Sequence, residues 1–163
     1  MDLLALEYDA PIFSRVAALE VVKADGIMLD SWIRQGVFEA EKKGRERRMS
    51  FEHLLTLDII HLLIDGFRMR PSGAGEVAAI ACSQYRPFFP NDAKDIAAGR
   101  PWSAPHQDRG DTQEEGFIRD TDGTLRRFRE TDDPSASVAI IVPTRLIARR
   151  LLASLRDVEV AVD

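Results

Sequence analysis

The sequence lacks several features that would assign it to a familiar class. It has one cysteine, Cys82, in 163 residues, so no intramolecular disulfide can form, which is usual in a reducing compartment. No apolar run is long enough to cross a bilayer as a helix. The N-terminal stretch MDLLALEYDA is acidic and lacks the basic region of a secretory signal. We therefore expect a cytoplasmic protein that does not bind membranes.

Signatures of common enzyme sites are also missing. The sequence holds no GxSxG, Walker A or GxGxxG motif, which would present a nucleophile or surround a phosphate with backbone N–H groups. No pair of carboxylates stands in a convincing pocket context. We therefore expect no enzymatic activity and no cofactor.

Candidate metal ligands do not converge in this sequence. His61 shares a polar helix edge with Asp58 and Asp65, but such an edge is more often only solvated. The DTDG stretch that starts at Asp120 opens like a calcium loop. A calcium loop needs a bidentate carboxylate at its twelfth position, which is Thr131 here. We expect no metal site, and we interpret DTDG as a hairpin turn.

The balance of charge is acidic, with one local exception. The formal net charge is −5, which argues against indiscriminate binding of polyanions. The exception is the segment 42–48, where Glu46 is the only acidic residue. Its cations are Lys42, Lys43, Arg45, Arg47 and Arg48. Any binding of phosphate should be focused on this segment.

The segment 28–67 organises the predicted fold. It predicts a short helix that ends at Gly36, a basic loop, and a long apolar helix with Ser50 as its N-cap. A helix so apolar must be packed on several sides. We expect its core residues to include Leu55, Ile59, Leu62 and Leu63, with Trp32 packed near them. A further helix over about 14–23 should begin at Ser14, and Asp25 can help to cap the short helix. After the long helix we expect a turn over 68–75 and another short helix over 76–83.

In this order and spacing, these segments resemble the MerR-type winged-helix domain, a helix-turn-helix variant that excisionases and phage packaging subunits also use. The resemblance covers Ile12 to about Ala81. It rests on MLDSWIRQGVF for the second helix, RERRMS for the junction between wing and helix, and HLLTLDIIHLLIDGF for the third helix. Asp30 and Ser31 stand where the family usually places an arginine and a tyrosine facing DNA.

The resemblance implies a winged-helix domain over residues 11–83 that binds double-stranded DNA, most simply as a transcription regulator. The second helix would enter the major groove and the wing would contact flanking phosphates. The implied DNA-binding residues are Asp30, Ser31, Arg34, Gln35, Lys42, Lys43, Arg45, Arg47 and Arg48. Because a carboxylate is repelled by phosphates, we expect the wing to matter more than base contacts from the second helix.

The rest of the chain predicts a second structural unit. Together the two units predict an α+β fold. Residues 84–115 contain several prolines with little periodicity, and we interpret them as a linker. Residues 116–163 predict a hairpin around DTDG, a buried strand at 137–142, a helix that Thr144 caps, and a terminal strand at 158–162.

Two questions stay open at the level of sequence. The apolar stripe of the last helix suggests a homodimer formed through residues 116–163, although the stripe could equally be covered by its own sheet. A phage or mobile-element role in DNA architecture or packaging, and an acidic winged helix that binds a protein, are alternatives to transcription regulation. The sequence names neither an operator nor a small-molecule effector.

Overall fold

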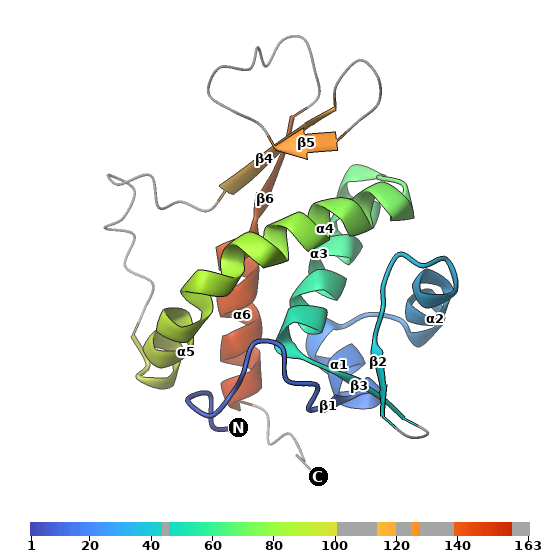
Figure 1. The fold of residues 1–163 in the computed structure, drawn as a ribbon. Helices are drawn as coiled ribbons and strands as arrows, with labels where there is room; N and C mark the ends of the chain where they lie inside the picture. Colours follow the sequence, from blue (N-terminus) through green and yellow to red (C-terminus); the bar gives the residue numbers. More distant parts are fainter. Residues whose placement is uncertain (44–45, 101–113, 120–124, 128–138, 158–163) are drawn as a thin grey trace.

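The computed structural model describes residues 1–43, 46–100, 114–119, 125–127 and 139–157 (Figure 1). The elements in chain order are β1 (Phe13–Ser14), α1 (Arg15–Val22), α2 (Gly26–Arg34), β2 (Glu41–Lys43), β3 (Glu46–Met49), α3 (Phe51–Phe67), α4 (Pro71–Tyr85), the 3-10 helix η1 (Arg86–Phe88), α5 (Phe89–Ala97), β4 (Glu114–Arg119), β5 (Leu125–Arg127), β6 (Ala139–Pro143) and α6 (Thr144–Asp157). The described part is rich in helix and carries two small antiparallel sheets, as the predicted α+β class requires.

Side-chain caps fix where the first three helices begin. Ser14 accepts a hydrogen bond from the backbone N–H of Ala17 at the start of α1, and Asp25 accepts one from Ile27 at the start of α2. Ser50 and His53 form a reciprocal capping box at the start of α3. Gly36 follows α2 with φ of 69°, the left-handed conformation expected of a helix end. The predicted caps at Ser14, Asp25 and Ser50 are therefore confirmed. The predicted cap at Thr144 is not seen, because Thr144 is the first residue of α6 and its hydroxyl donates to the carbonyl oxygen of Val142.

Helix α3 lies at the centre of the hydrophobic core, between α4, α6 and α1. Leu55, Ile59 and Leu63 are fully buried and Trp32 nearly so, as predicted. The prediction was wrong for Leu62, which remains 37% exposed. Leu62 lies on the edge of α3 that carries Asp58 and Asp65, where α6 does not cover it completely.

Two helices occupy residues that the sequence analysis assigned to turns and to the linker. Helix α4 begins at Pro71 rather than near residue 76, and α5 lies inside the predicted linker 84–115. The reason is the position of the prolines. Pro71 and Pro90 stand in the first turn of their helices, where proline is tolerated because that N–H has no intrahelical partner.

A buried ion network joins α5 to α6. The carboxylate of Asp92 is fully buried and accepts hydrogen bonds from Arg145 Nη2 at 2.9 Å and Arg149 Nη1 at 2.6 Å. The hydroxyl of Tyr85 donates to the same carboxylate at 3.2 Å. Burial, followed by the neighbouring Asp92 charge, raises the pKa of Tyr85, so its hydroxyl stays protonated and able to donate. Through this network α6 is held on α5 from inside the protein.

The hydrophobic core runs across the predicted domain boundaries. Buried residues of α6 belong to the same core as those of α1, α3 and α4. Much of the apolar stripe of α6 is buried, at Ile147, Leu151, Leu152 and Leu155. This stripe was the motive for the homodimer, which stays a prediction.

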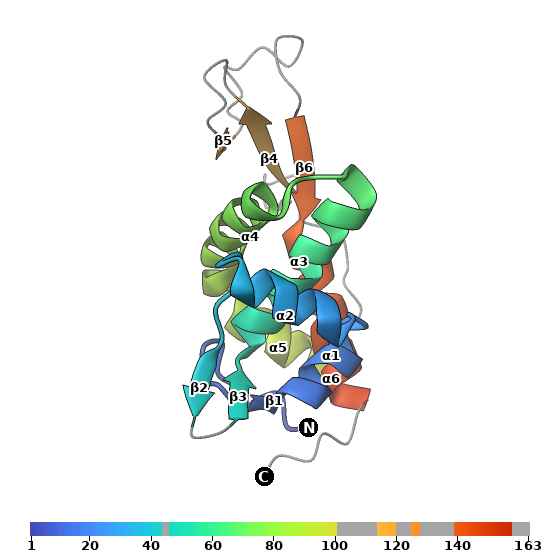
Figure 2. The ribbon, with the colours of Figure 1, turned by 90° about the vertical axis from the view of Figure 1, so that its right-hand side faces the viewer.

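The second sheet has the order β5–β4–β6 and lies at the opposite end of the molecule from the β2–β3 hairpin (Figure 1, Figure 2). Strands β4 and β5 pair with Arg119 opposite Leu125, which confirms the predicted hairpin. Strand β6 confirms the described part of the strand predicted at 137–142 and continues to Pro143, whereas residues 137 and 138 lie outside the described residues. The DTDG turn and the strand expected at 158–162 lie outside the described residues.

A matched pair of leucines tests the position of α3. Replacing fully buried Leu63 with alanine should lower the free energy of unfolding by about 2–5 kcal/mol, because it leaves a cavity in the core. Leu62→Ala on the same helix should cost only about 1 kcal/mol, because water already reaches that side chain. Urea unfolding of both variants measures the difference. Equal losses of unfolding free energy in the two variants would contradict the burial of Leu63 and the partial exposure of Leu62.

The ion network gives a second prediction about stability. Asp92→Asn should lower the free energy of unfolding by about 3–5 kcal/mol, because it removes the nearer of the two carboxylates that pair with the buried Arg149 guanidinium. Asp9→Asn is the control, since the Asp9–Arg86 pair is about half exposed and should contribute at most about 1 kcal/mol. Thermal unfolding at matched salt concentration checks both values. An Asp92→Asn variant as stable as the wild type would exclude a structural role for the network.

Candidate functional site

An arginine at the start of α1 fixes the orientation of α2. Arg15 Nη2 donates to the carbonyl oxygen of Gly26 and to Asp30 Oδ2, each at 2.9 Å. A Cβ added at Gly26 would lie 3.0 Å from the same Arg15 nitrogen, so the absence of a side chain allows this close approach. The first turn of α2 is therefore held against α1 by a single guanidinium.

The β2–β3 hairpin is tied to the helices through the short strand β1. Phe13 pairs with Met49 and Ser14 with Arg48, so that β3 is the central strand of this sheet. Arg48 Nη1 also donates to the carbonyl oxygen of Ile12 at 3.3 Å. Figure 2 shows the hairpin on the same side of the molecule as α1 and α2.

Helix α2 and strand β3 together line a hollow of about 420 Å³. Its lining consists of Ile27, Asp30, Ile33, Arg34 and Arg47. The first four side chains come from α2 and the last comes from the hairpin. This hollow, which we call the α2–β3 hollow, brings together the two elements that the sequence analysis expected at DNA.

The structure places the predicted residues of α2 in internal contacts. Asp30 is paired with Arg15, and Gln35 Nε2 donates to Ser31 Oγ at 2.9 Å. Arg34 Nε donates to the carbonyl oxygen of Asp30 at 3.3 Å, which leaves its two terminal nitrogens directed elsewhere. All four polar residues therefore make a contact within α2 and its C-cap or with α1, and Arg34 does so through Nε alone.

The predicted wing residues are only partly described. Arg47 lines the α2–β3 hollow, and Arg48 is directed to Ile12 instead. For Lys42 and Lys43 the structure describes the backbone, which pairs with Arg47 and Glu46, and Arg45 lies outside the described residues. Among the described side chains of the hairpin, Arg47 is therefore the cation that lines the hollow.

Sequence reasoning missed Arg15 and Ile27. Arg15 stands in the resembled first helix, but its contact with Asp30 depends on how α1 crosses α2, which no local pattern records. Ile27 comes directly before the stretch MLDSWIRQGVF, and it is 76% exposed. Its position at helical spacing from Asp30 and Arg34 was the available signal.

A close backbone approach fixes the path from α2 to the hairpin. A Cβ added at Gly75 of α4 would lie 2.9 Å from the carbonyl oxygen of Val37 and 3.1 Å from its Cγ1. Val37 follows Gly36 directly and donates its N–H to the Trp32 carbonyl at 2.9 Å. The chain leaving α2 is therefore pressed against α4 before it enters β2.

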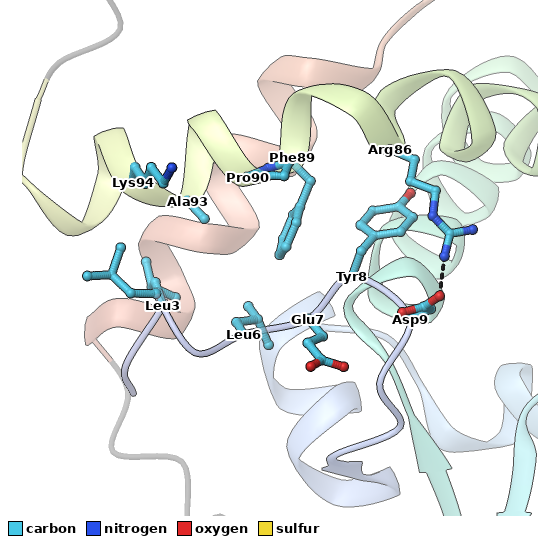
Figure 3. A pocket seen from close by; sticks show the side chains of 11 residues that line it. Leu3, Leu6, Glu7, Tyr8, Asp9, Arg86, Phe89, Pro90, Ala93 and Lys94 are labelled. Atoms are coloured by element: carbon cyan, nitrogen blue, oxygen red, sulfur yellow. Dashed lines mark hydrogen bonds and ion pairs between the residues drawn. The ribbon is translucent and has the colours of Figure 1, made fainter.

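A cavity larger than this hollow lies elsewhere, between the N-terminal segment and α5 (Figure 3). It measures about 560 Å³, and its walls include Leu3, Leu6 and Phe89. An ion pair between Asp9 and Arg86 borders it, and the Arg86 guanidinium lies over the Tyr8 ring at 5.6 Å. Burial raises the pKa of Tyr8, whose hydroxyl donates to the carbonyl oxygen of Cys82. The polar groups of Asp9, Arg86 and Tyr8 are therefore satisfied within the protein.

The polar side chains at the edge of α3 contact one another and α6. Asp58 is nearly buried and pairs with Arg150 of α6, and His61 Nε2 lies 2.8 Å from Asp65. Among the described residues, no three His, Cys, Asp or Glu side chains are grouped so as to hold a metal ion. None of the helices in the described ranges combines the length and apolar character that a membrane crossing requires.

No family model matches the chain, and no curated protein does either.

The Gly75 contact generates a prediction for the site. Gly75→Ala should lower the free energy of unfolding by about 1–3 kcal/mol, because the new methyl group would collide with the Val37 backbone. Gly66→Ala in α3 is the control. Its new methyl group would meet nothing closer than Leu62 Cδ1 at 3.8 Å, so alanine should stabilise that helix by about 0.5–1 kcal/mol. If Gly75→Ala lowers the free energy of unfolding in urea and Gly66→Ala raises it, the close approach of Gly75 to Val37 is supported. If both variants are more stable than the wild type, this close approach is ruled out.

Proposed function

We propose that this chain binds double-stranded DNA through a winged helix-turn-helix formed by α1, α2, the β2–β3 hairpin and α3, and that it acts as a transcription regulator. The observation that carries the proposal is that Arg34 of α2 and Arg47 of β3 line one hollow. A helix beside a cationic hairpin is the arrangement that such domains use to contact a groove and its flanking phosphates.

The local charge favours a polyanion although the whole chain is acidic. The Asp30 carboxylate would repel phosphate, but the Arg15 guanidinium lies 2.9 Å from it and offsets its charge. Within the described part of the chain, neither Arg34 nor Arg47 forms a salt bridge with a carboxylate. Two cations therefore remain available around the hollow, and binding would be confined to this face.

The contacts inside α2 favour phosphate binding over base reading by its polar residues. Asp30, Ser31 and Gln35 would each have to leave an internal partner before reaching a base edge. Arg34 uses one nitrogen internally and keeps its terminal nitrogens for an acceptor. Affinity should therefore come mainly from cations and depend steeply on salt.

The test is a titration of labelled duplex DNA at several salt concentrations. The double variant Arg34→Ala and Arg47→Ala should weaken binding to every duplex sequence. It should also flatten the slope of log affinity against log salt by about 0.9 for each phosphate that is no longer neutralised, or about 2 in total. The double variant Arg70→Ala and Arg100→Ala is the control, because it changes net charge equally at exposed positions outside the hollow.

Three results discriminate between the possibilities. Loss of affinity in the first variant alone supports the α2–β3 hollow as the DNA site. Equal loss in both variants would show that only the total charge matters. Absence of duplex binding by the wild-type chain at low salt would overturn the proposal and favour a winged helix that binds a protein.

A further inference from the structure

Ile27 is the large apolar side chain of α2 that contributes least to the core. It is 76% exposed, whereas Leu29 and Trp32 of the same helix are buried. It nevertheless lines the α2–β3 hollow together with Arg34 and Arg47. Folding therefore does not explain an isoleucine at this position.

Helical geometry places Ile27 on the face that would meet DNA. Residues three and seven positions further along a helix lie on the same side, and these are Asp30 and Arg34. Ile27 is also the second residue of α2. In helix-turn-helix proteins the N-terminal residues of the recognition helix contact base edges.

The chemistry of the major groove restricts what an isoleucine could recognise there. Bases present hydrogen-bond donors and acceptors in this groove, which an aliphatic side chain cannot pair with. The apolar group that unmodified DNA offers is the 5-methyl group of thymine. The polar neighbours Asp30 and Ser31 are engaged with Arg15 and Gln35, so they do not compete for the same contact.

We propose that Ile27 is a specificity-determining residue that contacts the thymine 5-methyl group, so that the protein prefers T-containing sites. This inference rests on the proposed DNA-binding function. It assigns base selection to an apolar contact at the start of α2, while Arg34 and Arg47 supply affinity that does not depend on sequence.

The experiment compares duplexes that differ only in this methyl group. The probes are an alternating A·T duplex and the same duplex with uracil in place of thymine. Wild-type protein should bind the thymine duplex more tightly, by about fourfold for each methyl group contacted. Ile27→Ala should bind both duplexes equally, at the affinity that the wild type shows for the uracil duplex.

A second pair of probes separates the methyl group from the shape of A·T-rich DNA. An alternating G·C duplex with 5-methylcytosine carries the methyl group at the corresponding position in the groove. The wild type should prefer it to the unmethylated duplex, and Ile27→Ala should not. Val16→Ala is the matched control, because Val16 is 73% exposed on α1 and does not line the hollow. It should keep both preferences.

The outcomes distinguish this inference from the proposed function. A wild type that binds duplex DNA without any preference for the methylated probes overturns the role of Ile27 and leaves DNA binding intact. A preference that persists in Ile27→Ala also overturns it. A wild type that binds none of the four duplexes refutes both DNA binding and the contact with thymine.

Discussion

The burial of α3 is the constraint on which the other elements depend. A seventeen-residue helix with apolar side chains around most of its circumference cannot be stable unless neighbours cover it on several sides. Helices α4, α6 and α1 and strand β3 supply that cover. The α2–β3 hollow follows from this packing, because α1 and β3 dock on α3 and carry α2 and the hairpin with them.

Charge is used differently in the interior and at the candidate site. In the interior, the Asp92 carboxylate pairs with Arg145 and Arg149 away from water. This ion network therefore affects the stability of the fold and the packing of α6 against α5. At the candidate site, the Arg15–Asp30 pair is about half exposed and contributes little to stability. Its consequence is electrostatic, since it offsets the negative charge of the carboxylate that lines the hollow together with Arg34 and Arg47. An acidic chain can thereby keep one cationic face.

Local chemistry made much of the fold predictable from the sequence. Ser14, Asp25 and Ser50 cap helices because each side chain satisfies a backbone N–H within three residues, and that signal is contained in the sequence itself. The prolines were misinterpreted because proline stops a helix in its interior but suits its first turn, and the sequence alone did not distinguish the two positions at Pro71 and Pro90.

The candidate site was less predictable than the helices. Arg34 and Arg47 could be named from the resemblance. The engagement of Asp30 by Arg15 depends on the crossing of two helices, and so does the exposure of Ile27. The sequence did not indicate that α6 shares the core of α1, α3 and α4, because Asp92 and Arg149 are 57 residues apart and their pairing leaves no local pattern.

The single cysteine has a practical consequence for following the motions of this protein. Cys82 is 1% exposed, and its sulfur lies 3.3 Å from the Thr56 hydroxyl where α4 packs against α3. A thiol reagent can reach that sulfur only after the two helices have separated. The rate of labelling in the native state therefore reports how often this contact opens, and comparing it with the global unfolding rate distinguishes a local fluctuation from complete unfolding. The chain thus contains a built-in probe of its own core, with no second thiol to obscure the signal.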